Sequence, residues 1–287
     1  FRPREVAESR FYGGYDPEFL FRKVELLYTA YQHRDEFKRF VNAATGAEND
    51  ESLTDQYFRG LAVEIHCSTF QQIESLFALL IAVFQNLPHW LYLSRYTNEE
   101  MLGKIKGFAA GHVADISGGA CQTASQFVTK AIYAGVAEAE TGPRWKRTRE
   151  DLAWFLSEMA TRYIKGRDEY NAYKHGLRML PGDGAQLLVE VGRGTGDFRR
   201  ILSMGHSLSY LEVEKRPTDY ITREVTKEIN PEDSFQAAYI MSEIATTACK
   251  IRLAVIRGEK GVETPTFEID RASLVRLKPV ARFALPF

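Results

Sequence analysis

Apolar residues recur three or four positions apart through the first 180 residues. This spacing is typical of amphipathic helices. Asp16 and Pro17 provide a capping acceptor and a first-turn proline for a helix that runs to about Tyr31. We therefore expect the N-terminal part of the chain to be helical.

The second predicted helix runs from about residue 54 to residue 84 and ends before Pro88. Its section 73–84 is apolar on nearly every side, apart from Glu74 and Ser75. A helix with no polar face is normally buried. We expect this helix to lie at the centre of the protein.

Three further helices are predicted before the pattern changes. The spacing of Thr97 and Glu100 is that of a capping box, which opens one helix. After a break at Gly118 and Gly119, a second helix spans 122–136, and a long third helix begins near Thr148 and continues to Met179. The sequence thus predicts at least five helices before Met179.

From residue 181 the pattern changes to short alternating segments, which favour strands. The predicted strands are 187–191, 207–213 and 220–225, and a last helix follows over 230–256. Strands without intervening helices indicate an antiparallel sheet. We predict a mainly α fold, with a helical bundle over 1–180. A small antiparallel sheet and a helix that packs back on the bundle follow over 181–287, without forming an independent domain.

Composition and charge limit the function classes. The formal net charge is −1, which argues against a chain-wide electrostatic grip on nucleic acid. Three scattered cysteines indicate buried thiols in a reducing compartment, and no spacing suits a metal. The most apolar run, 76–84, is shorter than a bilayer requires. We expect a cytoplasmic protein with no membrane contact, no cofactor and no metal.

One segment carries most of the candidate chemistry. On a helix, Asn171, Lys174, His175 and Arg178 stand at i, i+3, i+4 and i+7, which is one face. We call these four residues the polar stripe. An amide, an ammonium, an imidazole and a guanidinium on one face can hold a phosphate or handle a proton.

The pattern Asn171-x-x-x-His175 resembles the motif of the HEPN superfamily, in which an arginine precedes the polar residue. Tyr170 stands in the position of that arginine, and Glu74 resembles the acidic residue that faces the motif in the family. The resemblance implies a helical bundle that is often homodimeric. It also implies metal-independent endoribonuclease relatives that occur in toxin–antitoxin and defence systems.

The replacement of arginine by tyrosine decides how the resemblance is interpreted. Metal-free RNA cleavage needs a proton carrier, which His175 can be, and a positive charge at the phosphorus. Tyr170 brings no charge, so Arg167 or Arg178 would have to supply it. Three readings stay open. The first is a non-catalytic module that binds RNA or a nucleotide, with Lys174, Tyr170 and Glu74 as its ligand-binding residues. The second is an endoribonuclease that uses His175. The third is a structural or protein-interaction bundle in which these polar groups only fix packing.

Two other segments suggest ligand sites at first sight. Residues 192–197 are glycine-rich and follow a predicted strand, but no helix opens behind them, so we interpret them as a turn between strands. The basic run 145–149 is interpreted as a solvated helix start.

Overall fold

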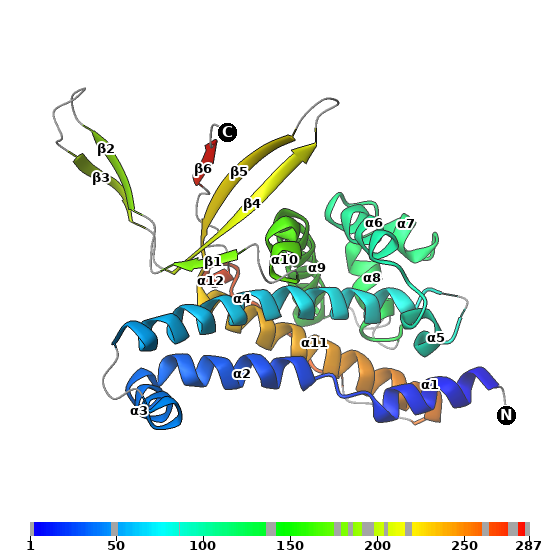
Figure 1. The fold of residues 1–287 in the computed structure, drawn as a ribbon. Coiled ribbons are helices and arrows are strands. Elements are labelled where there is room, and N and C mark those ends of the chain that lie inside the picture. The colour runs from blue at the N-terminus through cyan, green and yellow to red at the C-terminus, as the bar shows by residue number, and fades with distance from the viewer. Residues whose placement is uncertain are drawn as a thin grey trace. The chain divides into compact units, whose positions relative to one another are not determined.

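A computed structural model describes the ranges 3–46, 51–85, 87–135, 142–174, 179–182, 186–190, 198–203, 206–215, 220–259, 264–274 and 281–284. The helices are α1 (Pro3–Gly14), α2 (Phe19–Gln32), α3 (Arg34–Thr45), α4 (Glu51–Ala82), α5 (His89–Leu93), α6 (Asn98–Ala109), α7 (Val113–Ser117), α8 (Ala124–Ala131), α9 (Pro143–Lys165), α10 (Arg167–Lys174), α11 (Pro231–Arg257) and α12 (Arg271–Leu274). The strands are β1 (Met179–Gly182), β2 (Gln186–Glu190), β3 (Phe198–Ser203), β4 (Ser207–Lys215), β5 (Tyr220–Glu228) and β6 (Ala281–Ala284) (Figure 1).

The predicted fold class is confirmed, because the chain is mainly helical and a small antiparallel sheet precedes the long helix α11. The cap at Thr97 is also confirmed, since its side chain accepts from the Glu100 amide at 3.2 Å. The break at Gly118 and Gly119 exists as well, and both residues have positive φ angles, of 60° and 83°. Within the described residues, no helix has the length and apolar character that crossing a bilayer requires.

The prediction of one helix from 148 to 179 is wrong. Helix α9 begins earlier, at Pro143, because proline suits the first helical position. It ends at Lys165, and Gly166 closes it, with its amide bonded back to the carbonyls of Arg162 and Ile164. Glycine in a helix interior costs about 1 kcal/mol relative to alanine, which favours a break there. Met179 lies in strand β1.

The chain divides into two compact units that interleave along the sequence, whereas the sequence prediction placed a single boundary at residue 180. Unit 1 comprises 1–22, 70–166 and 237–274, and unit 2 comprises 23–69, 167–236 and 275–287. The helices α2, α4 and α11 each contribute residues to both units.

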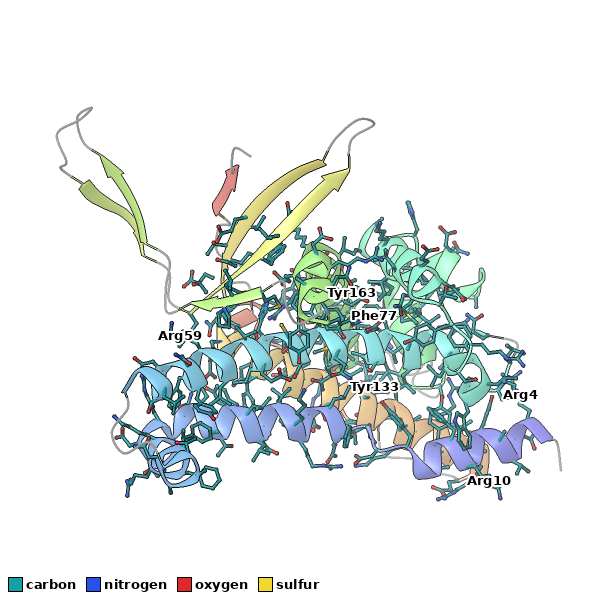
Figure 2. All side chains as sticks on the ribbon, viewed as in Figure 1. Arg4, Arg10, Arg59, Phe77, Tyr133 and Tyr163 are labelled. Atoms are coloured by element: carbon teal, nitrogen blue, oxygen red, sulfur yellow. The ribbon has the colours of Figure 1, made fainter. Side chains whose placement is uncertain are left out.

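Unit 1 is a set of helices around an aromatic core. Helices α6 and α8 pack against α9, and α1 packs against α5. Phe77 and Tyr133 are fully buried (Figure 2). The α4 residues 73–82, which the sequence predicted to be buried, are buried almost without exception.

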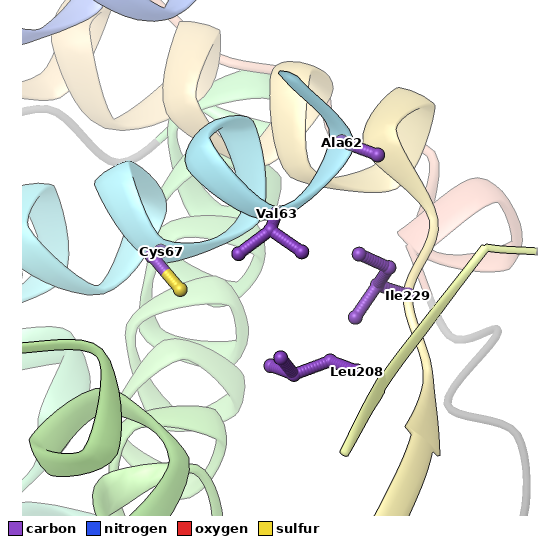
Figure 3. Packing of buried hydrophobic residues seen from close by; sticks show 5 residues of the cluster. All are labelled: Ala62, Val63, Cys67, Leu208 and Ile229. Atoms are coloured by element: carbon purple, nitrogen blue, oxygen red, sulfur yellow. The ribbon is translucent and has the colours of Figure 1, made fainter. Parts of the chain in front are cut away.

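Unit 2 combines the N-terminal half of α4 with α10 and an antiparallel sheet in the order β1-β4-β5-β6. Figure 3 shows Ala62, Val63 and Cys67 of α4 facing Leu208 and Ile229, and all five are buried. Helix α10 packs against β4 and β1. These contacts hold the N-terminal half of α4 and helix α10 against the sheet. They thereby position the polar groups described next.

Candidate functional site

Helix α10 has a buried side and a polar side. Glu169, Tyr170 and Ala172 are buried, while Lys174 is exposed and Arg167 and Asn171 are partly exposed. The last three stand at i, i+4 and i+7, which is one helical face. We call Arg167, Asn171 and Lys174 the outer face of α10.

The buried side of α10 is held by a carboxylate between two cationic or ionisable groups. Glu169, whose side chain is 4% exposed, lies 2.8 Å from the ammonium of Lys227 on β5. Its other oxygen lies 3.2 Å from Nε2 of His66 on α4. Burial disfavours the charged carboxylate, yet His66 and Lys227 outweigh it, and the pKa of Glu169 lies below its ordinary value. Glu169 therefore stays ionised and ties α10 to both α4 and β5.

The same buried network reaches two further elements. His66 Nδ1 lies 3.4 Å from Oγ of Ser234 in the first turn of α11. The Lys227 ammonium also lies 5.4 Å from the ring centroid of Tyr210 on β4. Burial lowers the pKa of Lys227, but the Glu169 carboxylate more than compensates and the pKa is raised. Both partners of the pair are thus charged at neutral pH.

A second carboxylate, that of Glu64 on α4, also contacts α10. The Tyr173 hydroxyl lies 2.7 Å from both oxygens of Glu64, and the Lys23 ammonium lies 2.5 Å from one of them. The Glu64 side chain is 30% exposed, so this pair lies at the edge of the core. Burial, and then Glu64, raise the pKa of Tyr173, which keeps the phenol protonated.

Tyr170 occupies a packing position. It is 3% exposed, its ring stacks on Tyr173 with centroids 6.4 Å apart, and the Lys174 ammonium lies 4.2 Å from its centroid. A phenol in this place brings no positive charge, because its ordinary pKa is about 10. Tyr170 therefore serves contacts inside unit 2.

The outer face of α10 differs in its contacts. Within the described residues, the side chains of Arg167 and Asn171 form no hydrogen bond or ion pair. Asp168, which is also exposed, lies about a quarter of a turn away and brings one negative charge. With no partner among the residues that the structure describes, this guanidinium and this amide have their donors available for a ligand.

Not all of the predicted site residues can be placed. His175 and Arg178 lie outside the described residues, so their roles stay predictions. Glu74 belongs to unit 1, where it contributes to raising the pKa of Tyr96 after burial does. That Glu74 faces the stripe also stays a prediction, as does the resemblance to HEPN proteins.

Sequence reasoning missed the residues that anchor α10: Glu64, His66, Glu169 and Lys227. Glu169 could have been found from the sequence, because helical spacing places it on the same side of α10 as Tyr170 and Tyr173. No signal in the sequence connects Lys227 or His66 with α10, because their proximity arises only from the packing of β5 and α4.

The sequence also singled out the cysteines, a basic run and a glycine-rich segment. The three cysteines are buried and free. Among the described residues, no group of three or more His, Cys, Asp or Glu side chains could hold a metal ion. Trp145 packs edge-on against Tyr133. Residues 192–197 lie outside the described part, between the antiparallel strands β2 and β3.

Comparisons with protein-family models, with curated proteins and with solved structures find no match for this chain. Function must therefore be argued from the residues of unit 2 themselves.

Proposed function

We propose that this chain is a non-catalytic, HEPN-like binding module that holds the phosphate backbone of RNA on the outer face of α10. The observation that carries the proposal is the division of α10 into two sides. Glu169 fixes the helix from within, and Arg167 and Asn171 present donors without partners among the described residues.

The chemistry of the outer face suits a phosphodiester. Arginine offers a planar fork of N–H donors that matches phosphate oxygens. The Asn171 amide adds neutral donors, and the exposed Lys174 adds a second positive charge. Contacts of this kind bind the backbone without reading its sequence.

Cleavage is not part of the proposal because of Tyr170. Loss of a preorganised positive charge at a transition-state anion typically costs on the order of 100-fold or more in rate. The buried Tyr170 supplies no such charge. The ribonuclease alternative requires His175 as the proton carrier and Arg167 or Arg178 as the source of the positive charge that Tyr170 lacks.

The test is a fluorescence anisotropy titration of a labelled single-stranded RNA at several salt concentrations. We expect Arg167→Gln to weaken binding of every sequence and to reduce the salt slope by about 0.7, the value of one lost contact to a single strand. Arg39→Gln is the matched control, because Arg39 is an exposed arginine on α3 of the same unit. Equal effects of the two changes would refute the assignment to α10.

The two alternatives have their own outcomes. RNA cleavage in excess EDTA that disappears in a folded His175→Ala protein would support the ribonuclease. Absence of any RNA binding, with both variants as stable as the parent, would support a structural or protein-interaction bundle. The Glu169 network is also what a purely structural bundle would use to hold α10 in place.

A further inference from the structure

A non-helical segment of unit 1 lies against α9 without belonging to any strand. Residues 264–270 have no regular secondary structure and lead into α12. The Tyr133 hydroxyl, just after α8, donates to the carbonyl of Pro265 at 2.9 Å. We call residues 265–271 the strap, and we call the surface formed by Tyr133, Thr148, Asp151 and Trp154 the α9 groove.

One buried hydroxyl of the groove contacts both backbone groups of a single strap residue. The Thr148 hydroxyl donates to the carbonyl of Phe267 at 3.1 Å. Its oxygen accepts from the amide of the same residue, also at 3.1 Å. Thr148 is 0% exposed. This double contact recognises the backbone rather than a particular side chain, as peptide-binding surfaces do.

A carboxylate fixes the end of the strap. Asp151, 4% exposed, accepts from the Ile269 amide at 3.4 Å. It also accepts from Nη2 and Nε of Arg271, at 2.7 and 3.0 Å. The Arg271 guanidinium lies 5.4 Å from the ring centroid of Trp154, and Ile269 is buried. Backbone donors, an apolar anchor and a terminal arginine together define a peptide register.

An open cleft of about 720 Å³ borders the C-terminal end of the strap and shares Asp151 with the groove. It is lined by Arg147, Glu150, Asp151, Glu268, Asp270 and Arg271, among others. The strap is therefore accessible at its polar C-terminal end. Hydrogen bonds, the Asp151–Arg271 ion pair and the buried Ile269 hold it on unit 1.

We propose that the α9 groove is a binding site for extended peptides, that the strap fills it in cis, and that the strap of a second copy of this chain is the partner it accepts in trans. A groove that fits a segment of its own chain also fits the identical segment of another copy, and only the linker differs. A tethered segment competes at an effective concentration in the millimolar range, so the cis strap masks the site in the parent protein.

The experiment measures binding of a fluorescein-labelled peptide with the sequence of residues 264–274 to the full-length chain. Arg271→Glu weakens the cis strap from its exposed end, where the Arg271 side chain is 48% exposed, and leaves the groove intact. We expect this variant to bind the peptide at least about ten-fold more tightly than the parent does. Lys106→Glu, an exposed charge reversal on α6 of the same unit, should bind it as weakly as the parent.

Two further measurements make the assignment specific. Adding Thr148→Val to Arg271→Glu should abolish peptide binding, with folding checked by circular dichroism. A peptide N-methylated at the position of Phe267 lacks the N–H from which the Thr148 hydroxyl accepts a hydrogen bond. It should not bind Arg271→Glu either, and this test changes the peptide only. The proposal is overturned if Arg271→Glu binds the peptide no better than the parent, or if the N-methylated peptide binds equally well.

Discussion

The strongest prediction concerns the buried pair of Glu169 and Lys227. Glu169→Gln removes the counter-charge of an ammonium whose side chain is only 16% exposed and which lies 2.8 Å away. Removal of one partner from a buried ion pair costs about 3–5 kcal/mol, and the residual exposure of Lys227 places this case near 3 kcal/mol. Such a loss lowers the folding equilibrium constant roughly 150-fold.

The assay is urea unfolding by circular dichroism, combined with hydrogen exchange of peptides covering α10 and β5. All three tryptophans lie in unit 1, so intrinsic tryptophan fluorescence reports separately on that unit. Adding Lys227→Met removes the unpaired charge and should recover at least about 2 kcal/mol.

The control is Glu150→Gln, which breaks the exposed pair of Lys146 and Glu150 at 4.0 Å and should cost less than about 0.5 kcal/mol. Equal, small effects of Glu169→Gln and Glu150→Gln would show that the buried network does not hold α10, and the reasoning would fail.

Three further changes have defined outcomes. Burial lowers the pKa of His89 from 6.5 to about 4, so the unfolded chain takes up the proton first. Stability should be complete above pH 6.5 and fall by about 1.4 kcal/mol per pH unit towards pH 4, and a pH series of melting curves should flatten in His89→Gln. Tyr170→Arg should cost about 3–5 kcal/mol in urea unfolding by burying an unpaired charge, and it should gain no RNA cleavage. Thr97→Ala removes the cap that accepts from Glu100 and should lower the free energy of unfolding by about 1 kcal/mol, whereas Thr161→Ala, away from any cap, should cost less.

Much of the helical content could be predicted from the sequence, because its signals are local. The cap at Thr97 is such a signal, and α6 and α11 begin where the sequence predicts. The strands β4 and β5 alternate in character and were also predicted. Local signals are reliable when side chains only a few positions apart decide the structure.

The break at Gly166 escaped prediction because the apolar spacing continues across it from Tyr163 to Tyr170. Only the backbone at Gly166 and the division of the units reveal that α10 is a separate helix. The sequence singles out Glu74 because it is a lone acid in an apolar run. Within unit 2, Glu64 contacts Tyr173 of α10, and Glu169 of α10 pairs with Lys227.

The central claim is that RNA lies on the outer face of α10, and photochemical crosslinking tests it most directly. The parent protein would be irradiated with single-stranded RNA containing 4-thiouridine, and the modified peptides identified by mass spectrometry. We predict crosslinks within or next to residues 167–174, with their yield reduced in Arg167→Gln and unchanged in Arg39→Gln. Crosslinks confined to other elements, or a yield that Arg167→Gln leaves unaltered, would contradict the account.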